Sequence, residues 1–249
     1  MNDRQSQILH AVAKERRIEV GKLSELVGVS QATVRKDLIY LEKKGLICRE
    51  HGVALLNAEN DISNRLAVHY ERKLDIASRA AELISDGDVI MLESGSCCAL
   101  LAEQIAAKRK NVTIITYSVF IANHIRPAAG NSVILLGGKI QMEPMLTVGP
   151  LAVEAVSHFY VDRFFTGTDG ITPGGEFTAQ NLELAEVIRA MAKNARQTIV
   201  MTDSSKFSRQ GTVCLFPASS VYAVYTDPGC PPRIRQLLEE NGVLLNTGE

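Results

Sequence analysis

Residues 20–44 read VGKLSELVGVSQATVRKDLIYLEKK, a pattern that predicts two helices joined by a tight turn. Apolar residues recur at helical spacing on one face of the first helix: Val20, Leu23 and Leu26. Gly28 can adopt the left-handed conformation that ends a helix, and Ser30 can accept a backbone N–H group and start the next one. Both ends of the turn therefore carry the residues that a helix-turn-helix needs.

The second helix has an apolar stripe and a polar first turn. The stripe consists of residues at i, i+4 and i+7, namely Val34, Leu38 and Leu41. Gln31, Arg35 and Lys36 lie near the helix start and off that stripe. Arginine can fork onto guanine, glutamine can pair with adenine and lysine can hold phosphate, so this turn suits the major groove of DNA. The alternative is a plain helical hairpin with a solvated charged face, but the caps, turn and polar first turn all favour DNA binding.

The flanking residues extend this pair of helices. Upstream, apolar residues predict an amphipathic first helix: Ile8, Leu9 and Val12. Downstream, residues 46–56 (LICREHGVALL) predict a small hairpin. Three helices followed by a hairpin form a winged helix-turn-helix, in which Arg49 and His51 can reach phosphates from the wing.

The run VSQATVRKDLIYLEKKGLICREHGVALL, residues 29–56, resembles the N-terminal signature of the DeoR family of bacterial transcriptional regulators. That signature reads V-S-x-x-T-[IV]-R-[RK]-D-L, then L-E-x-x-G, then R-x-H-G-G-A. The chain departs from it at Val53, which replaces the second glycine. The resemblance implies binding to a double-stranded DNA operator. The residues expected to bind DNA are Ser30, Gln31, Thr33, Arg35, Lys36, Arg49 and His51.

The composition indicates a globular protein of about two domains. The chain has 249 residues, of which 46% are hydrophobic. Residues 1–56 hold 10 Lys and Arg against 7 Asp and Glu, whereas the remainder holds 17 against 21, an asymmetry that suits DNA binding at one end. Five cysteines without C-x-x-C spacing argue against a disulfide frame or a zinc site. Since neither a secretory signal nor a long apolar stretch is present, we expect a cytoplasmic protein with no membrane contact, metal or cofactor.

The chain changes character after the expected wing. We expect residues 1–57 to form the DNA-binding domain, 58–72 a polar linker that runs into a helix, and 73–249 an α/β domain. Short apolar runs alternate there with helical patterns, which predicts a mostly parallel sheet covered on both faces. The expected strands are 89–92, 112–116, 133–136, 163–166, 198–202, 221–225 and 243–245. The expected helices are 73–85, 98–107, 119–126, 181–194 and 231–241.

Polar or glycine-rich residues follow five of these strands, at the edge where open α/β sheets bind ligands. Gly-Ser loops at helix starts offer N–H groups and hydroxyls to an anion, and a lysine completes a phosphate cradle. Gly and Ser are also ordinary turn residues, but five such loops on one sheet edge favour a pocket. The loops are 93–96 (ESGS), 116–118 (TYS), 137–139 (GGK), 167–170 (GTDG) and 203–206 (DSSK).

These five loops resemble, in order, those of the DeoR sensor domain, whose usual forms are D-x-G-[ST]-T, T-N, G-G, G-x-[DEN]-G and D-[SH]-[ST]-K. That domain is similar in fold to sugar-phosphate isomerases and acyl-CoA transferases. The resemblance implies a phosphorylated sugar as effector, with its phosphate facing Gly95, Ser96 and Lys206. The residues expected to bind the effector are Glu93, Gly95, Ser96, Cys97, Thr116, Gly137, Gly138, Lys139, Gly167, Asp169, Gly170 and Lys206.

The chain departs from those forms at several positions. Glu93 stands where Asp is common, Cys97 replaces Thr and Tyr117 replaces Asn. Asn181 and Ile188 occupy positions where relatives often have Asp and Lys. Each change can reshape the pocket, so the sequence does not assign to this chain the effector that is commonest in the family.

Two other functions compete with a regulator. The first is a sugar-phosphate isomerase-like enzyme carrying a DNA-binding appendage, which needs a carboxylate base beside a cation. Glu93, Asp169, Asp203 and Lys206 could serve, but two ionisable positions of relatives are replaced here.

The second is a thiol sensor built on Cys97 and Cys98, but adjacent cysteines seldom close a disulfide without strain. We therefore expect a regulator, specifically a repressor, of carbohydrate metabolism and not an enzyme. We also expect a homo-oligomer, a dimer or tetramer, because two-fold symmetry doubles the few base pairs that one recognition helix reads.

Overall fold

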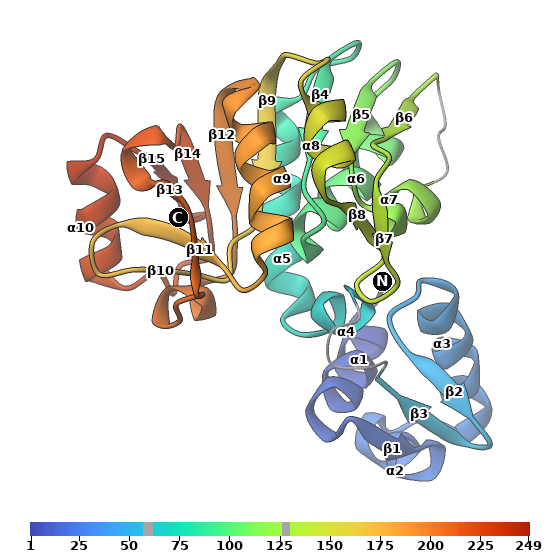
Figure 1. Cartoon of the computed structure of the whole chain (residues 1–249). Coiled ribbons are helices and arrows are strands. Elements are labelled where there is room, and N and C mark those ends of the chain that lie inside the picture. Colours follow the sequence, from blue (N-terminus) through green and yellow to red (C-terminus); the bar gives the residue numbers. More distant parts are fainter. Residues whose placement is uncertain (57–61, 126–129) are drawn as a thin grey trace. The chain divides into compact units, whose positions relative to one another are not determined.

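A computed structural model (Figure 1) describes residues 1–56, 62–125 and 130–249 of the chain. The chain divides into two compact units, Met1–Glu71 and Arg72–Glu249. Part of the expected linker, 58–61, lies outside the described residues. The rest contains helix α4 (Ile62–Ala67) and the beginning of α5 (Tyr70–Ala80). The boundary between the units thus falls at the end of the expected linker.

The first unit contains the helices and the hairpin that the sequence predicts. Its helices are α1 (Asp3–Glu15), α2 (Val20–Val27) and α3 (Gln31–Lys43). The wing is formed by β2 (Cys48–Glu50) and β3 (Val53–Leu55). A short strand that the sequence analysis missed, β1 (Arg17–Glu19), adds to the wing and gives an antiparallel sheet of order β1-β3-β2. This unit is a winged helix-turn-helix.

Local sequence explains the turns of this unit. Gly28 ends α2 in the left-handed conformation, with φ of 66°, and the Ser30 hydroxyl accepts the Thr33 N–H group at 3.3 Å to cap α3. At the wing tip, His51 and Gly52 form a two-residue turn with φ values of 26° and 84°. Positive φ at both positions is the conformation that suits a tight hairpin.

The core of the first unit follows the expected apolar stripes with one exception. The expected residues that are buried are Ile8, Leu9, Val12, Val20, Leu23, Val34, Leu38 and Leu41. Leu26 shares the spacing of Val20 and Leu23 but is 56% exposed. Its spacing predicted a core position, but the last turn of α2, which carries Leu26, is partly exposed to solvent.

The second unit is built on a seven-stranded sheet in which every strand pair is parallel. Its strands are β4 (Val89–Leu92), β5 (Thr113–Thr116), β6 (Ser132–Leu135), β9 (Val161–Thr166), β12 (Ala195–Met201), β14 (Ala223–Tyr225) and β15 (Leu244–Asn246). The order is β15-β14-β12-β9-β4-β5-β6. From β4 the chain moves outward through β5 to β6, and from β9 it moves the other way to β15. The strand order therefore reverses between β4 and β9, the kind of position where such sheets bind ligands.

Helices cover both faces of this sheet. One face packs against α8 (Pro150–Val156), α9 (Leu182–Lys193) and α10 (Pro232–Glu240) through alternating strand residues such as Met91, Phe164 and Val200. The opposite side carries α5, α6 (Ser96–Lys108) and α7 (Val119–His124) (Figure 1). The intervening strand residues, including Ile90 and Phe165, are also buried. Burial on both faces explains why the strands are continuously apolar.

The sequence analysis missed several short elements of the second unit. The longest is helix α8 (Pro150–Val156). The others are the hairpin of β7 (Lys139–Gln141) and β8 (Leu146–Val148), and a small antiparallel sheet of β10 (Gly170–Ile171), β11 (Glu176–Ala179) and β13 (Val213–Pro217). Three 3-10 turns were also missed: η1 (Ala81–Leu83), η2 (Ser204–Ser208) and η3 (Ala218–Ser220). Elements of two to five residues are too short for a periodic pattern, and their pairing depends on contacts with distant segments.

Some expected boundaries were also displaced. Helix α5 ends at Ala80, before the expected end at residue 85, and α6 begins at Ser96, two residues before the expected start. Helix α7 ends at His124, while residue 126 of the expected helix lies outside the described part. In the part of the chain that the structure describes, no helix is both long and apolar enough to cross a bilayer.

Candidate functional sites

The first turn of α3 presents the polar side chains expected to contact DNA. Gln31, Arg35 and Lys36 are all exposed. The Arg35 guanidinium donates to Gln31 Oε1 at 3.2 Å, so the two side chains that can read base edges are aligned along the same side of the helix. Ser30 is exposed at the cap, and its hydroxyl lies 3.0 Å from that of Thr33.

The two expected wing contacts differ in their surroundings. His51 is exposed at the wing tip. Arg49 is held by the recognition helix, because its Nε and Nη2 atoms donate to Glu42 Oε2 at 2.8 and 2.5 Å. Arg49 therefore has to exchange a carboxylate for a phosphate if it binds DNA, whereas His51 does not.

A residue that the sequence analysis did not single out anchors the recognition helix. Asp37 is 4% exposed, and its carboxylate accepts hydrogen bonds from Arg4 Nε at 2.6 Å and from Gln5 Nε2 at 3.0 Å. These contacts join the beginning of α1 to α3. The aspartate of the R-K-D-L run thus has a positioning role, and its place on the buried stripe beside Val34 and Leu38 was the available signal.

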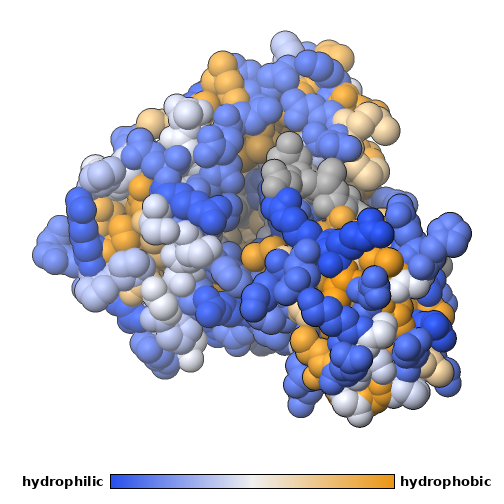
Figure 2. Space-filling view, turned by 90° about the horizontal axis from the view of Figure 1, so that it is seen from below, coloured by the Kyte–Doolittle hydropathy of each residue, from blue (hydrophilic) through white to orange (hydrophobic). Residues whose placement is uncertain are grey.

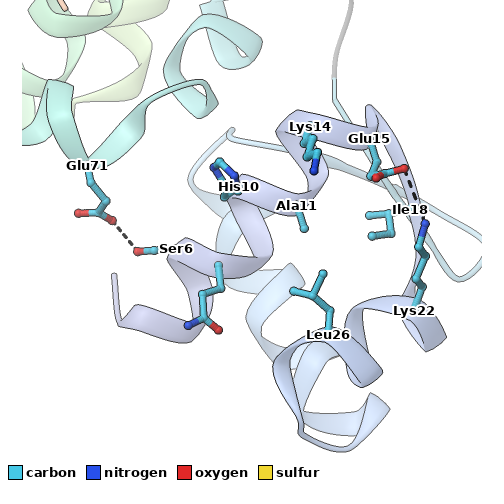
Figure 3. A pocket seen from close by; sticks show the side chains of 10 residues that line it. Ser6, His10, Ala11, Lys14, Glu15, Ile18, Lys22, Leu26 and Glu71 are labelled. Carbon is cyan, nitrogen blue, oxygen red and sulfur yellow. Dashed lines mark hydrogen bonds and ion pairs between the residues drawn. The ribbon is translucent and has the colours of Figure 1, made fainter. Parts of the chain in front are cut away.

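A hollow of about 460 Å³ lies between α1 and α2 (Figure 3). Its floor includes Ala11, Ile18 and the exposed Leu26, and its rim carries charged side chains, with an ion pair of 3.7 Å between Lys22 and Glu15. All described residues that line it come from α1, β1, α2 and the start of α5, so it is separate from the first turn of α3. The space-filling view shows apolar patches between hydrophilic side chains on the face that it presents (Figure 2).

In the second unit, the parallel strands bring the five expected loops to one edge of the sheet. Glu93 follows β4, Tyr117 follows β5 and Gly167 follows β9, and these three strands are neighbours. A sixth loop, after β14, was missed. Its Asp227 is 6% exposed and accepts hydrogen bonds from the Ser204 N–H group at 2.6 Å and the Ser204 hydroxyl at 2.8 Å.

The carboxylate of Glu93 is buried among protein donors. It is 5% exposed, and its Oε2 atom accepts the N–H groups of Gly95 at 2.6 Å and Gly167 at 3.1 Å. Its Oε1 atom accepts the hydroxyls of Ser94 and Tyr117, both at 3.1 Å. The side chain therefore joins the ends of β4, β5 and β9.

The N-terminus of α6 lies beside this carboxylate. Gly95 is the cap residue, and no side chain caps the helix. The first helical hydrogen bond runs from the Ala99 N–H group to the Gly95 carbonyl at 2.9 Å. The helix itself supplies no acceptor for the N–H groups of Ser96, Cys97 and Cys98, which is the usual arrangement of an anion site.

Charged side chains from several elements surround Cys97. Burial is the main cause that raises the pKa of its thiol to about 12, while Lys73 and Lys206 lower it and Asp203 and Glu93 raise it. Cys97 therefore stays a neutral thiol among two cations and two carboxylates. Lys73, on α5, is only 6% exposed. It was missed because a lysine in an amphipathic helix resembles an ordinary surface residue.

Lys206, predicted as a phosphate ligand, lies in the 3-10 turn η2 that follows β12. Its side chain is 27% exposed, and its ammonium lies 3.5 Å from Asp169 Oδ1, a loose ion pair. Asp169 also accepts the Gln180 N–H group at 3.0 Å, so its carboxylate is held from the small antiparallel sheet.

The other expected effector ligands have local roles that explain their residue types. Lys139 is 68% exposed and pairs with Glu183 Oε1 at 3.1 Å. A Cβ atom at Gly138 would lie 2.7 Å from the Val148 carbonyl oxygen, and one at Gly170 would lie 2.1 Å from that of Arg209. Thr116 is buried and accepts the Ser118 N–H group at 3.1 Å, and Gly137 is exposed. Their binding roles stay predictions.

Two family descriptions match the chain along most of its length. A DeoR-like helix-turn-helix domain matches residues 4–60, and a DeoR C-terminal sensor domain matches residues 68–228. The chain belongs to the DeoR family. The first unit therefore corresponds to the helix-turn-helix domain of this family, which binds DNA, and the second unit to its sensor domain.

Similarity to individual relatives also extends over nearly the whole chain. The HTH-type transcriptional repressor GlcR of Bacillus subtilis (strain 168) is 31% identical over 96% of this chain and 93% of its own. The glycerol-3-phosphate regulon repressor of Escherichia coli (strain K12) is 28% identical over 97% of both chains. Among solved structures, ribose 5-phosphate isomerase from Plasmodium falciparum is 20% identical over 54% of this chain and 52% of its own, with a TM-score of 0.40. That last likeness concerns the fold alone.

Within the ranges that the structure describes, no group of three or more His, Cys, Asp or Glu residues is arranged to hold a metal ion.

Proposed function

We propose that this DeoR-family chain is a repressor of carbohydrate-metabolism genes whose sensor domain binds a phosphorylated sugar that alters operator binding. The carrying observation is that the charges of Lys73 and Lys206 act on Cys97, in the first turn of α6, where no side chain caps the helix. Helix N–H groups and ammonium groups together are a phosphate site. The two relatives described above, a transcriptional repressor and a glycerol-3-phosphate regulon repressor, support the same class of function.

The operator contacts that we propose come from the first turn of α3 and from the wing. Arg35 and Gln31 would read bases, and Lys36, Ser30, Thr33 and His51 would hold phosphates. Because one such helix reads few base pairs, we propose that the protein binds a two-fold operator as a homo-oligomer in the cytoplasm.

Isomerase activity is the disfavoured alternative. It would need a free carboxylate beside the substrate carbon. Glu93, whose carboxylate lies beside the N-terminus of α6, is already bonded to four protein N–H and O–H groups.

The test of the proposal has two steps. The operator is first selected from genomic DNA fragments with the purified chain. Operator binding is then measured across a panel of pentose, hexose and triose phosphates, with the unphosphorylated sugars as matched controls. A phosphorylated compound that changes operator affinity while its unphosphorylated form does not is the expected result, and turnover of any panel member would favour the enzyme instead.

A further inference from the structure

The strand order of the sheet reverses between β4 and β9, and the side chain of Glu93 lies at this point of the sheet edge. Glu93 is the first residue after β4, and its N–H group donates to the Phe165 carbonyl of β9 at 2.9 Å. Its carboxylate lies within hydrogen-bond distance of the backbone N–H groups of Gly95 and Gly167, on the loops after β4 and β9. The backbone donors at this point therefore already bind an anion.

The carboxylate has no acceptor capacity left for a ligand. Two carboxylate oxygens offer about four lone-pair sites. Two are used by the N–H groups of Gly95 and Gly167 and two by the hydroxyls of Ser94 and Tyr117. The Cys98 thiol also lies 3.8 Å from Oε2. A ligand hydroxyl could reach Glu93 only by displacing one of these donors.

The two glycines are explained by this close approach. A Cβ atom at residue 95 would lie 2.6 Å from Glu93 Oε2, and one at residue 167 would lie 3.3 Å from the same atom. The first distance is a clash and the second is tight, so both loops need glycine to bring their backbone to the carboxylate. The contact with Glu93 is thus enough to explain both glycines, and no bound ligand is needed to account for them.

Tyr117 completes the arrangement from the third strand. Its ring is fully buried in the core with Leu136, Leu146 and Val148, and its hydroxyl donates to Glu93 Oε1 at 3.1 Å. Burial, and then the charge of Glu93, raise the pKa of the Tyr117 hydroxyl well above its ordinary value, so it remains a donor. The Tyr117 side chain therefore lies at the end of β5 with its ring in the core and its hydroxyl bonded to Glu93.

We propose that Glu93 and Tyr117 act as one unit that positions the effector site and sets its specificity. Their bond holds the Gly95 and Gly167 loops together and keeps an anionic effector away from the N–H groups of both glycines. The inference rests on the proposed effector site. Phosphate is then left with the N–H groups of Ser96 and Cys97 and with Lys206.

The first experiment needs no ligand. Amide hydrogen exchange is measured by NMR on the full chain for wild type, Tyr117→Phe, Glu93→Gln and the double variant. Tyr117→Phe keeps the ring but removes the hydroxyl, which donates to Glu93 Oε1 at 3.1 Å and accepts the Ser94 N–H group and hydroxyl at 3.5 and 3.4 Å. Exchange at Gly95 and Gly167 should then rise by up to about tenfold. Gly167 contacts neither Tyr117 nor Ser94 in the described contacts, so a change at Gly167 reports coupling through Glu93, whereas a change at Gly95 can also arrive through its neighbour Ser94.

Matched variants separate coupling from general loosening. Tyr222→Phe removes a hydroxyl from an exposed tyrosine and should leave both glycines unchanged. Glu93→Gln keeps an oxygen for the two N–H groups and should perturb them less than Glu93→Ala, and the double variant should show less than the combined effect of its two changes. Unchanged exchange at Gly95 and Gly167 in Tyr117→Phe, or full additivity in the double variant, would overturn the proposal.

The second experiment uses inorganic phosphate as the probe on the same amide spectra. Phosphate should move the amide signals of Ser96 and Cys97 and leave those of Gly95 and Gly167 in place. Equal movement of the two glycine signals in wild type would show that Glu93 is displaced and would contradict its exclusion role. If phosphate moves none of them, the proposed anion site is wrong, while the exchange rates still decide the role of Glu93 and Tyr117.

Discussion

Arg4 Nε donates a hydrogen bond of 2.6 Å to Asp37 Oδ2, which joins the beginning of α1 to the recognition helix. Asp37 is nearly buried, whereas Arg4 is partly exposed and can be solvated without its partner. The position of α3, and with it the turn proposed to read DNA, thus depends on a buried carboxylate that is bonded to α1.

Asp37→Ala should lower the free energy of unfolding of the DNA-binding unit by about 1–3 kcal/mol, because Arg4 and Gln5 lose their common acceptor. It should also weaken operator binding. The measurements are denaturant unfolding and hydrogen exchange along α3 in the full chain. Glu25→Ala, at an exposed position of α2, is the control. Equal stability of the two variants would show that the buried contact is dispensable.

Arg35→Ala and Lys36→Ala should both weaken operator binding while the chain stays folded. Loss of a base contact from Arg35 costs about 1–3 kcal/mol of binding free energy. Loss of a phosphate contact from Lys36 should reduce the slope of log affinity against log salt concentration by about one. Gel-shift titrations at several salt concentrations measure both effects. Lys110→Ala, an exposed lysine of the sensor domain, is the matched control. Wild-type affinity in both α3 variants would remove this helix from the interface.

Lys206→Ala should weaken the response to the effector without changing operator affinity in its absence. A charge-assisted hydrogen bond to phosphate contributes about 1.5–3 kcal/mol, so the effector midpoint should rise about tenfold or more. Operator binding across an effector titration measures the shift. Lys193→Ala, at the exposed end of α9, should leave the midpoint in place. An unshifted midpoint for Lys206→Ala would exclude this residue from the site.

Thiol chemistry should distinguish the buried cysteines from the exposed ones. Cys48 and Cys214 are exposed and should react with a thiol reagent at neutral pH, whereas Cys97 and Cys98 should not. Mild peroxide should leave operator binding intact in wild type and in Cys97→Ser. Loss of binding in wild type alone would revive the thiol-sensor alternative.

The same thiol gives a pH dependence of stability. Burial raises the pKa of Cys97 from 9.0 to about 12, so the folded chain keeps a proton that the unfolded chain releases. The resulting stabilisation is complete below pH 9 and is lost as the pH rises towards 12. Above pH 9 the free energy of unfolding of wild type should therefore fall more steeply than that of Cys97→Ser. Parallel curves would mean that the Cys97 thiol titrates normally in the folded protein.

The oligomeric state should be a dimer or a larger even assembly. Two-fold symmetry pairs two recognition helices on a palindromic operator and sets the spacing of its half-sites. Light scattering at micromolar concentration measures the mass. A monomer that still binds its operator tightly would contradict this prediction.

The sequence by itself determined the helix-turn-helix, the wing and the parallel α/β sheet. Each depends on local signals: the caps at Gly28 and Ser30, the turn at His51 and Gly52, and the continuous apolar runs of the strands. It also placed the five loops at one sheet edge, because parallel strands direct all their carboxyl ends the same way. Local chemistry and chain direction were sufficient for these features.

Only the tertiary structure decided which polar groups in those loops are already used. Glu93, Tyr117 and Gly167 are separated by 24 to 74 residues along the chain, yet one carboxylate joins them. Lys73 and Asp37 likewise gained their roles from packing against segments that no local pattern identifies. A hydrogen bond depends on distances of a few tenths of an ångström between atoms, and these distances are set when the elements pack together.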